Sequence, residues 1–72
     1  MNSTLFKAYL IQHNETQQSF AEKLGLSLSR LNAKINNTAG ADFSQSEIFA
    51  IQQLWQLTAQ EIQLIFFTNK LT

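Results

Sequence analysis

The chain has 72 residues, no cysteine and no net charge, since five Lys plus Arg balance five Asp plus Glu. We expect residues 1–72 to form one domain, because a chain of this length buries too little surface to support a second core. The lack of cysteine excludes disulfides and thiolate metal sites, which suits a reducing cytoplasm, and no segment has the ~20 apolar residues of a membrane helix.

The first helix is expected to begin after Ser3, whose hydroxyl can cap it, and to run to about His13. Its apolar residues recur at helical spacing and form one stripe, which consists of Leu5, Phe6, Tyr9 and Leu10. We expect His13, the single histidine, to interact with the carbonyl groups that are left free at the end of this helix.

Two short helices joined at a glycine are predicted next. Thr16 can cap a helix over Gln17–Leu24, and Ser27 can cap one over Leu28–Asn36. Gly25 lies between them and tolerates the positive φ that a tight turn requires. This pattern predicts a helix-turn-helix motif over about residues 17–36.

The second half of the chain is predicted to hold one loop and two helices. Residues 37–43 have no helical period, so we expect the longest loop there. Ser44 with Glu47, and Thr58 with Glu61, fit the capping box at the start of a helix. The fourth helix carries its apolar residues on one face, which holds Ile48, Ile51 and Trp55. The sequence therefore predicts an all-α fold of five helices.

The fifth helix is apolar nearly all round, with more large apolar side chains than one buried face needs. These residues are Ile62, Leu64, Ile65, Phe66, Phe67 and Leu71. Either the other helices surround this helix, or part of it joins a second chain. In the second case Phe66, Phe67 and Leu71 are the candidate oligomer interface, and the chain forms a homodimer.

Catalysis is not expected. The chain has one histidine and no cysteine, and its carboxylates lack the HExxH, GxSxG or paired-acid contexts of known reaction centres. We therefore expect no catalytic residue, no metal, no cofactor and no small-molecule substrate.

The third helix carries the candidate binding surface. Leu31 and Ile35 set its buried direction. The opposite and flanking positions hold Ser29, Arg30, Asn32, Ala33, Lys34 and Asn36. In a major groove Asn can pair with adenine and Arg with guanine, and the N–H groups beside Gln17 and Gln18 can face a phosphate. Leu28 lies about 40° from the buried direction, so both a core-edge position and an exposed contact stay open for it.

The charge distribution is unusual for a DNA-binding domain, which normally carries a basic excess. The first half of the chain is locally basic. Its charged residues are Lys7, Lys23, Arg30 and Lys34 against Glu15 and Glu22. A positive face is therefore possible in spite of the zero net charge.

The predicted motif resembles the lambda-repressor-like, Cro/C1-type family. The resemblance rests on Ala21, on Gly25 at the turn, and on the apolar positions Phe20, Leu24, Leu26 and Leu31. More narrowly, the segments LGLSLSRLNAKIN, DFSQSEI and EIQLIFF are similar to small phage-encoded regulators of Gram-positive hosts. The resemblance implies a compact five-helix domain that acts in the cytoplasm of a bacterial host, in the lysis-lysogeny switch.

The chain also departs from the family pattern. Leu28 and Ser29 lead the third helix and Ala33 is at its centre, where strong DNA readers carry long polar side chains. Lys34 occupies a position that is often aliphatic, and Ile35 takes over the core contact. Two functions stay open. The third helix binds operator DNA in a Cro-like repressor, or the same face binds the DNA-binding domain of the partner phage repressor and acts as an antirepressor.

Overall fold

The computed structural model describes residues 1–67, which contain five α-helices and no strand. The helices are α1 (Ser3–Gln12), α2 (Gln17–Leu24), α3 (Leu28–Asn36), α4 (Gln45–Trp55) and α5 (Ala59–Phe66), with one 3₁₀ helix, η1 (Thr38–Gly40). Over these residues the prediction of an all-α fold with five helices is confirmed. In this part of the chain no helix is long and apolar enough to cross a membrane.

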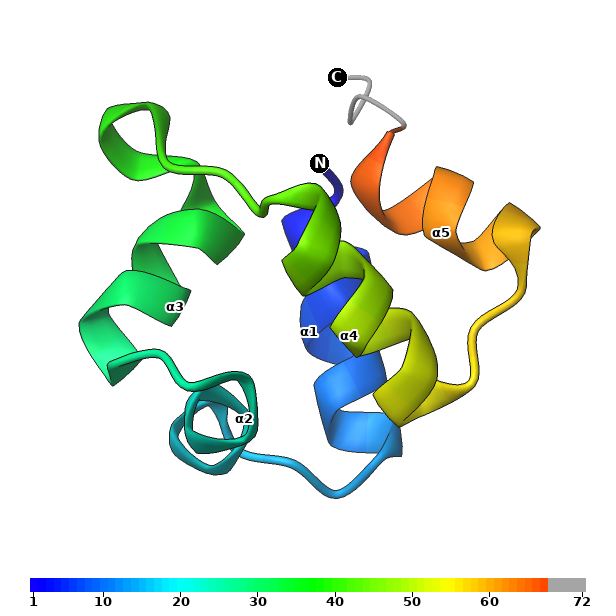
Figure 1. The fold of residues 1–72 in the computed structure, drawn as a ribbon, viewed down its shortest axis with the longest axis horizontal. Helices are drawn as coiled ribbons and strands as arrows, with labels where there is room; N and C mark the ends of the chain where they lie inside the picture. The colour runs from blue at the N-terminus through cyan, green and yellow to red at the C-terminus, as the bar shows by residue number, and fades with distance from the viewer. Residues whose placement is uncertain (68–72) are drawn as a thin grey trace.

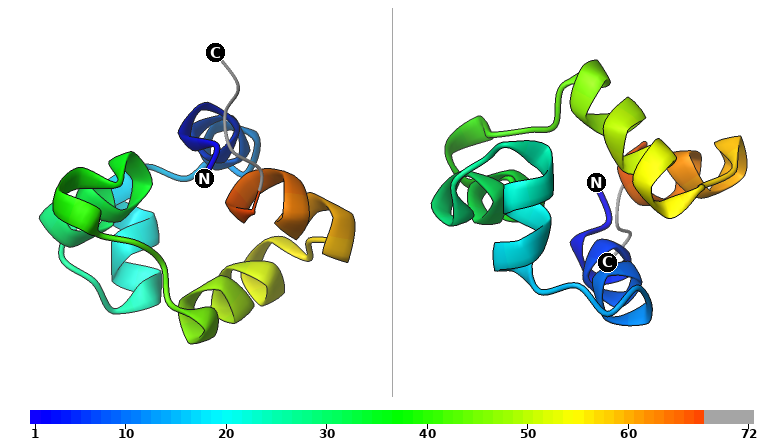
Figure 2. Two further views of the ribbon diagram at one scale, coloured as in Figure 1. Left: turned by 90° about the horizontal axis from the view of Figure 1, so that it is seen from above. Right: turned by 60° about the horizontal axis from the view of Figure 1, so that its bottom comes forward.

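The helices surround one core. In Figure 1, α2 and α3 lie on one side of the molecule and α5 on the other, with α1 and α4 between them. The view from above in Figure 2 shows that α1 and α4 face each other across the interior. Every helix contributes to the core, whose buried residues are Phe6, Leu10, Phe20, Ala21, Leu31, Ile35, Phe43, Ile51, Trp55, Leu57, Ile65 and Phe66.

Asn2, and not Ser3, caps the first helix. The Asn2 side chain accepts a hydrogen bond from the Leu5 N–H at 3.0 Å, and Ser3 is already the first helical residue. The expected cap was wrong by one residue because both side chains are good caps, and a distant contact selects between them. The Asn2 N–H donates to the Ile65 carbonyl at 2.8 Å, which holds Asn2 against α5, outside the helix.

The predicted caps of the other helices are confirmed. A side-chain oxygen accepts the N–H three residues later at Thr16 (3.0 Å), Ser27 (3.2 Å), Ser44 (3.2 Å) and Thr58 (3.1 Å). Both predicted capping boxes are closed, since Glu47 accepts from the Ser44 N–H at 2.8 Å and Glu61 from the Thr58 N–H at 2.9 Å. Four of the five helix starts are thus set by residues close in sequence.

The two glycines occupy left-handed turns. Gly25 ends α2 with a φ of 72°, as the predicted turn requires, and Gly40 ends η1 with a φ of 77°. The longest connection between α-helices in the described residues runs from Asn36 to Gln45, as predicted, and it contains a 3₁₀ turn at Thr38–Gly40 that was not expected. Three residues are too few for a hydrophobic period to show in the sequence.

The centre of the core is an aromatic cluster around Phe6. The fully buried Phe6 ring lies 5.9 Å from Phe20, 5.5 Å from Phe43, 5.2 Å from Trp55 and 6.1 Å from Phe66, measured between ring centroids. These partners come from α2, from the segment before α4, from α4 and from α5. One side chain of α1 therefore contacts rings from most of the chain.

His13 and Tyr9 extend this cluster to the surface. His13 is the C-cap residue of α1, where its backbone N–H donates to the Tyr9 carbonyl at 3.0 Å, and its ring stacks on Trp55 at 5.2 Å with an interplanar angle of 5°. The Tyr9 hydroxyl donates to Glu61 at 2.7 Å and connects α1 to α5. Among residues 1–67, the buried indole N–H of Trp55 has no hydrogen-bond partner.

Replacing Phe6 with alanine should lower the free energy of unfolding by about 3–5 kcal/mol, because it removes a fully buried ring and leaves a cavity. Urea denaturation followed by Trp55 fluorescence and by circular dichroism would measure the change. Ile11→Ala on the same helix is the control, since the Ile11 side chain is 77% exposed and its loss should change stability by less than about 0.5 kcal/mol. Equal effects of the two substitutions would contradict the assigned core.

The stability of the fold should decrease in acid. Hydrogen bonds from the Thr58 N–H and the Tyr9 hydroxyl lower the pKa of Glu61. Burial opposes ionisation of Glu47, but the Ser44 N–H and the Lys34 ammonium outweigh it and lower its pKa.

Because both folded pKa values lie below the ordinary value of 4.5, their contribution to stability is complete above pH 4.5 and is lost as the pH falls through the folded values. The melting temperature should therefore stay constant from neutral pH down to about pH 5 and fall below it. Glu61→Gln should make that fall shallower, and an unchanged acid profile in this variant would rule out the Glu61 contribution.

Candidate functional site

The exposed face of α3 lies where the helical period predicts it. Leu31 and Ile35 are buried in the core, with 0% and 1% of their surface exposed. On the other side of the helix, four of the predicted contact residues are exposed and a fifth, Ala33, is half-buried. The four exposed residues are Ser29, Arg30, Asn32 and Asn36. The helix α3 lies at the edge of the molecule, so this face points away from the core (Figure 1).

An open, mainly apolar depression lies on this face. It has a volume of about 590 Å³ and is lined by Leu28, Ser29, Asn32, Ala33 and Thr38. The sequence left open whether Leu28 lies at the edge of the core or on the exposed surface. The structure places it on the surface, with 42% of its area exposed. An exposed leucine in a depression can be buried by a side chain of a binding partner.

A chain of side-chain amides connects α2 to α3 next to this depression. The Asn36 amide donates to the Asn32 side-chain oxygen at 2.6 Å, and the Asn32 amide donates to the Gln17 side-chain oxygen at 3.4 Å. Gln18 makes a separate contact with Glu22 at 3.3 Å. The structure therefore brings the predicted residue Gln17 to the α3 face, and the hydrogen bonds restrict the orientation of Asn32.

Lys34 is the predicted contact residue that the structure places elsewhere. Its ammonium donates to Glu47 at 3.0 Å and to the Asp42 carbonyl at 2.9 Å, and its side chain is only 12% exposed. It also lies 6.0 Å from the ring of Phe43. The expectation of a free Lys34 on the exposed face was wrong, because the segment that follows α3 turns back and supplies acceptors for this lysine.

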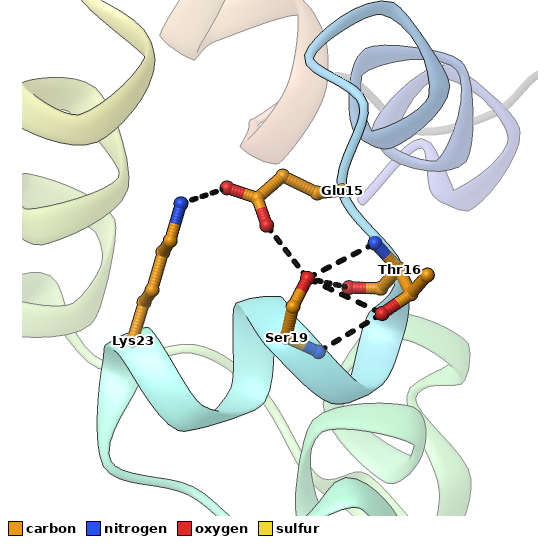
Figure 3. Close-up of polar contacts among 4 residues, drawn as sticks. All are labelled: Glu15, Thr16, Ser19 and Lys23. Carbon is orange, nitrogen blue, oxygen red and sulfur yellow. Dashed lines mark hydrogen bonds and ion pairs between the residues drawn. The ribbon is translucent and has the colours of Figure 1, made fainter.

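Lys23 is also paired. Figure 3 shows Glu15 next to the start of α2, where its carboxylate binds the Lys23 ammonium at one oxygen and accepts from the Ser19 hydroxyl, at 2.7 Å, at the other. Ser19 in turn closes the cap of α2 by accepting from the Thr16 N–H at 3.1 Å. The positive charge of Lys23 is thus balanced locally.

These two ion pairs change the charge of the candidate surface. The sequence suggests a locally basic first half, but Lys23 and Lys34 each have a carboxylate partner. Within the described residues, Arg30 is the only basic residue of α3 that has no such partner. The α3 face is therefore nearly neutral, with one cation beside an apolar depression.

The structure describes two of the three residues of the candidate oligomer interface, and it separates them. Phe66 is 8% exposed and its ring packs against Phe6 and Phe43, so its assignment to an interface was wrong. Phe67 is 61% exposed and stays a candidate, and Leu71 lies outside the described residues. The helical period could not decide which of the two adjacent phenylalanines is buried, because the sequence places large apolar residues nearly all round this segment.

Sequence reasoning missed two residues that shape this region. Thr38 lines the depression from η1, and Glu47 holds Lys34 from α4. Glu47 was identified only as a helix cap, and nothing in the sequence indicates that its carboxylate also accepts from a lysine on another helix.

No family model, curated protein or solved structure matches this chain.

Phe66, the last residue of α5, and Phe67, which follows it, should respond differently to truncation. Phe66→Ala removes a buried ring and should cost about 3–5 kcal/mol of stability, whereas Phe67→Ala should change stability by less than about 0.5 kcal/mol. Urea denaturation measures both values. Sedimentation of Phe67→Ala beside the unmodified chain then tests the interface, since a loss of self-association with an intact helical signal would assign Phe67 to it.

Proposed function

We propose that α2 and α3 form a helix-turn-helix of the lambda-repressor-like, Cro/C1-type family, and that the protein is an antirepressor. The α3 face binds the DNA-binding domain of a partner phage repressor and blocks its access to DNA. The proposal starts from the resemblance of residues 24–36, 42–48 and 61–67 to phage-encoded regulators. The left-handed Gly25 between two capped helices supports it.

The observation that favours a protein partner over DNA is the composition of the α3 face. A surface that binds the DNA backbone needs several free cations, because counterion release supplies most of the affinity. The α3 face offers Arg30 as its cation, beside an apolar depression that contains the exposed Leu28. Protein interfaces combine such apolar pockets with Arg, and a few residues of this kind carry most of the binding energy.

In this mechanism the protein acts by competition. A repressor whose DNA-contacting surface is covered by α3 cannot bind its operator at the same time, so repression falls as the antirepressor concentration rises. Arg30 is suited to a charge-assisted hydrogen bond with a carboxylate of the partner, and Leu28 to an apolar contact. Asn32, held by Gln17 and Asn36, offers a polar group in a fixed orientation.

A second candidate is direct binding of operator DNA in the cytoplasm of the bacterial host. The polar side chains of α3 support it, since Asn32 and Asn36 can pair with adenine and Arg30 with guanine. A dimer would place two α3 helices in major-groove segments about 34 Å apart. The exposed Phe67 is then the candidate dimer contact, and the shortage of free cations is the main argument against this function.

One binding experiment separates the two functions. A labelled duplex that carries the operator of the phage encoding this chain is titrated at about 50 and 200 mM salt, with and without the repressor of the same phage, and fluorescence anisotropy is measured. An antirepressor leaves the free duplex unbound and displaces the repressor from it. Binding of the duplex by this protein alone, with strong salt dependence, would refute the antirepressor and support the Cro-like repressor.

Two substitutions test the α3 face. Leu28→Ala and Arg30→Ala should each weaken the complex with the repressor by about tenfold or more, because each truncates a side chain expected at the centre of the interface. Isothermal titration calorimetry measures the affinity. Lys7→Ala on α1 is the control, since it also removes an exposed basic side chain. Wild-type affinity in both α3 variants would place the binding surface elsewhere.

A further inference from the structure

Arg30 and Lys34 lie four residues apart on α3, so both start from the same flank of the helix, with about 5–6 Å between their Cβ atoms. Two such cations at the edge of an exposed helix face are well placed to contact phosphates of a nucleic acid. In this protein they differ in exposure. Arg30 is exposed, whereas the Lys34 side chain is only 12% exposed.

Three groups from the segment before and at the start of α4 hold Lys34. The Glu47 carboxylate lies 3.0 Å and the Asp42 carbonyl 2.9 Å from the ammonium, and the Phe43 ring lies 6.0 Å from it. The Glu47 side chain is itself only 20% exposed. Because both partners are partly buried, salt screens this ion pair less than it screens a pair at the open surface.

A phosphate could recruit Lys34 only by separating it from Glu47. The Glu47 carboxylate would then be left half-buried without its cation, and its negative charge would lie near the incoming phosphate. Both effects make binding of a nucleic-acid backbone to this surface less favourable. A protein partner that fills the apolar depression meets neither cost, because Lys34 is not among the residues that line the depression.

We propose that Glu47 is a specificity-determining residue, which holds Lys34 away from the exposed face of α3 and so disfavours the nucleic-acid backbone as a ligand of this surface. The inference rests on the proposed function, in which the α3 face binds a protein. In this role Glu47 makes binding of nucleic acid, the competing ligand, less favourable. Interfaces commonly gain specificity by such unfavourable contacts with the wrong partner.

The fold offers a closely matched pair of substitutions for the test. Glu47 is the third residue of α4 and Glu61 is the third residue of α5, and each closes a capping box. Glutamine also fits this box, so Glu47→Gln and Glu61→Gln keep the helix starts and add the same change in net charge. Only Glu47→Gln removes the carboxylate that binds Lys34, since Glu61 bonds to Tyr9 and Thr58.

Both variants are titrated at neutral pH against a fluorescein-labelled DNA duplex of arbitrary sequence, with anisotropy as the readout. Glu47→Gln should bind this duplex more tightly than Glu61→Gln. Between about 50 and 200 mM salt it should also lose about threefold to fourfold more affinity, as one additional phosphate contact requires. The gain should disappear in Lys34→Gln/Glu47→Gln, which shows that the released lysine causes it.

Equal DNA affinity of Glu47→Gln and Glu61→Gln, including no detectable binding by either, would overturn the proposal. So would a gain that persists without Lys34. Circular dichroism and Trp55 fluorescence confirm that the variants are folded. The proposed function fails on a different result, namely binding of operator DNA by the unmodified protein alone, so the two failures are distinguishable.

Discussion

The Phe6 ring contacts four other aromatic rings, and the arrangement of the helices depends on these contacts. Phe20 belongs to α2, Phe43 precedes α4, Trp55 ends α4 and Phe66 ends α5. None of the five α-helices has more than 11 residues, and helices of this length are marginal in water on their own. Burial against a shared ring therefore stabilises them as a group. The helix α3 packs against both α2 and α1, and its buried residues Leu31 and Ile35 belong to the same core.

The sequence predicts the features of this fold that are decided within a few residues. Helix starts at Thr16, Ser27, Ser44 and Thr58 depend on a hydroxyl and an N–H three residues later, and all four are confirmed. The buried faces of α3 and α4 follow from helical spacing. Features that depend on distant partners could not be derived in this way. The bond to Ile65 that fixes Asn2, the ring contacts of Phe66 and the capture of Lys34 by Glu47 all join residues far apart in the chain.

For the candidate site, that difference changes the functional inference. A helical wheel places Lys34 and Arg30 on the same flank and suggests a basic surface, and counting residues gives a basic first half. The structure balances Lys23 with Glu15 and Lys34 with Glu47, so the charges that favour DNA are largely neutralised within the chain. What remains on α3 is one arginine, a row of amides and an apolar depression. This composition supports the protein partner that we propose over a nucleic acid.

The capping boxes also have a consequence for how the chain folds. Because the start of each helix from α2 onwards is specified by its own neighbours, these helix starts can form without waiting for the core. The contacts of Phe6 with Phe66 and of Asn2 with Ile65 join the two ends of the chain, so they require the closure of the longest loop. A small helical protein in which few contacts span the whole chain is expected to fold rapidly, within microseconds to milliseconds. We therefore expect closure of α5 onto α1 to be the slowest step of folding, while the starts of α2 and α3 can form earlier.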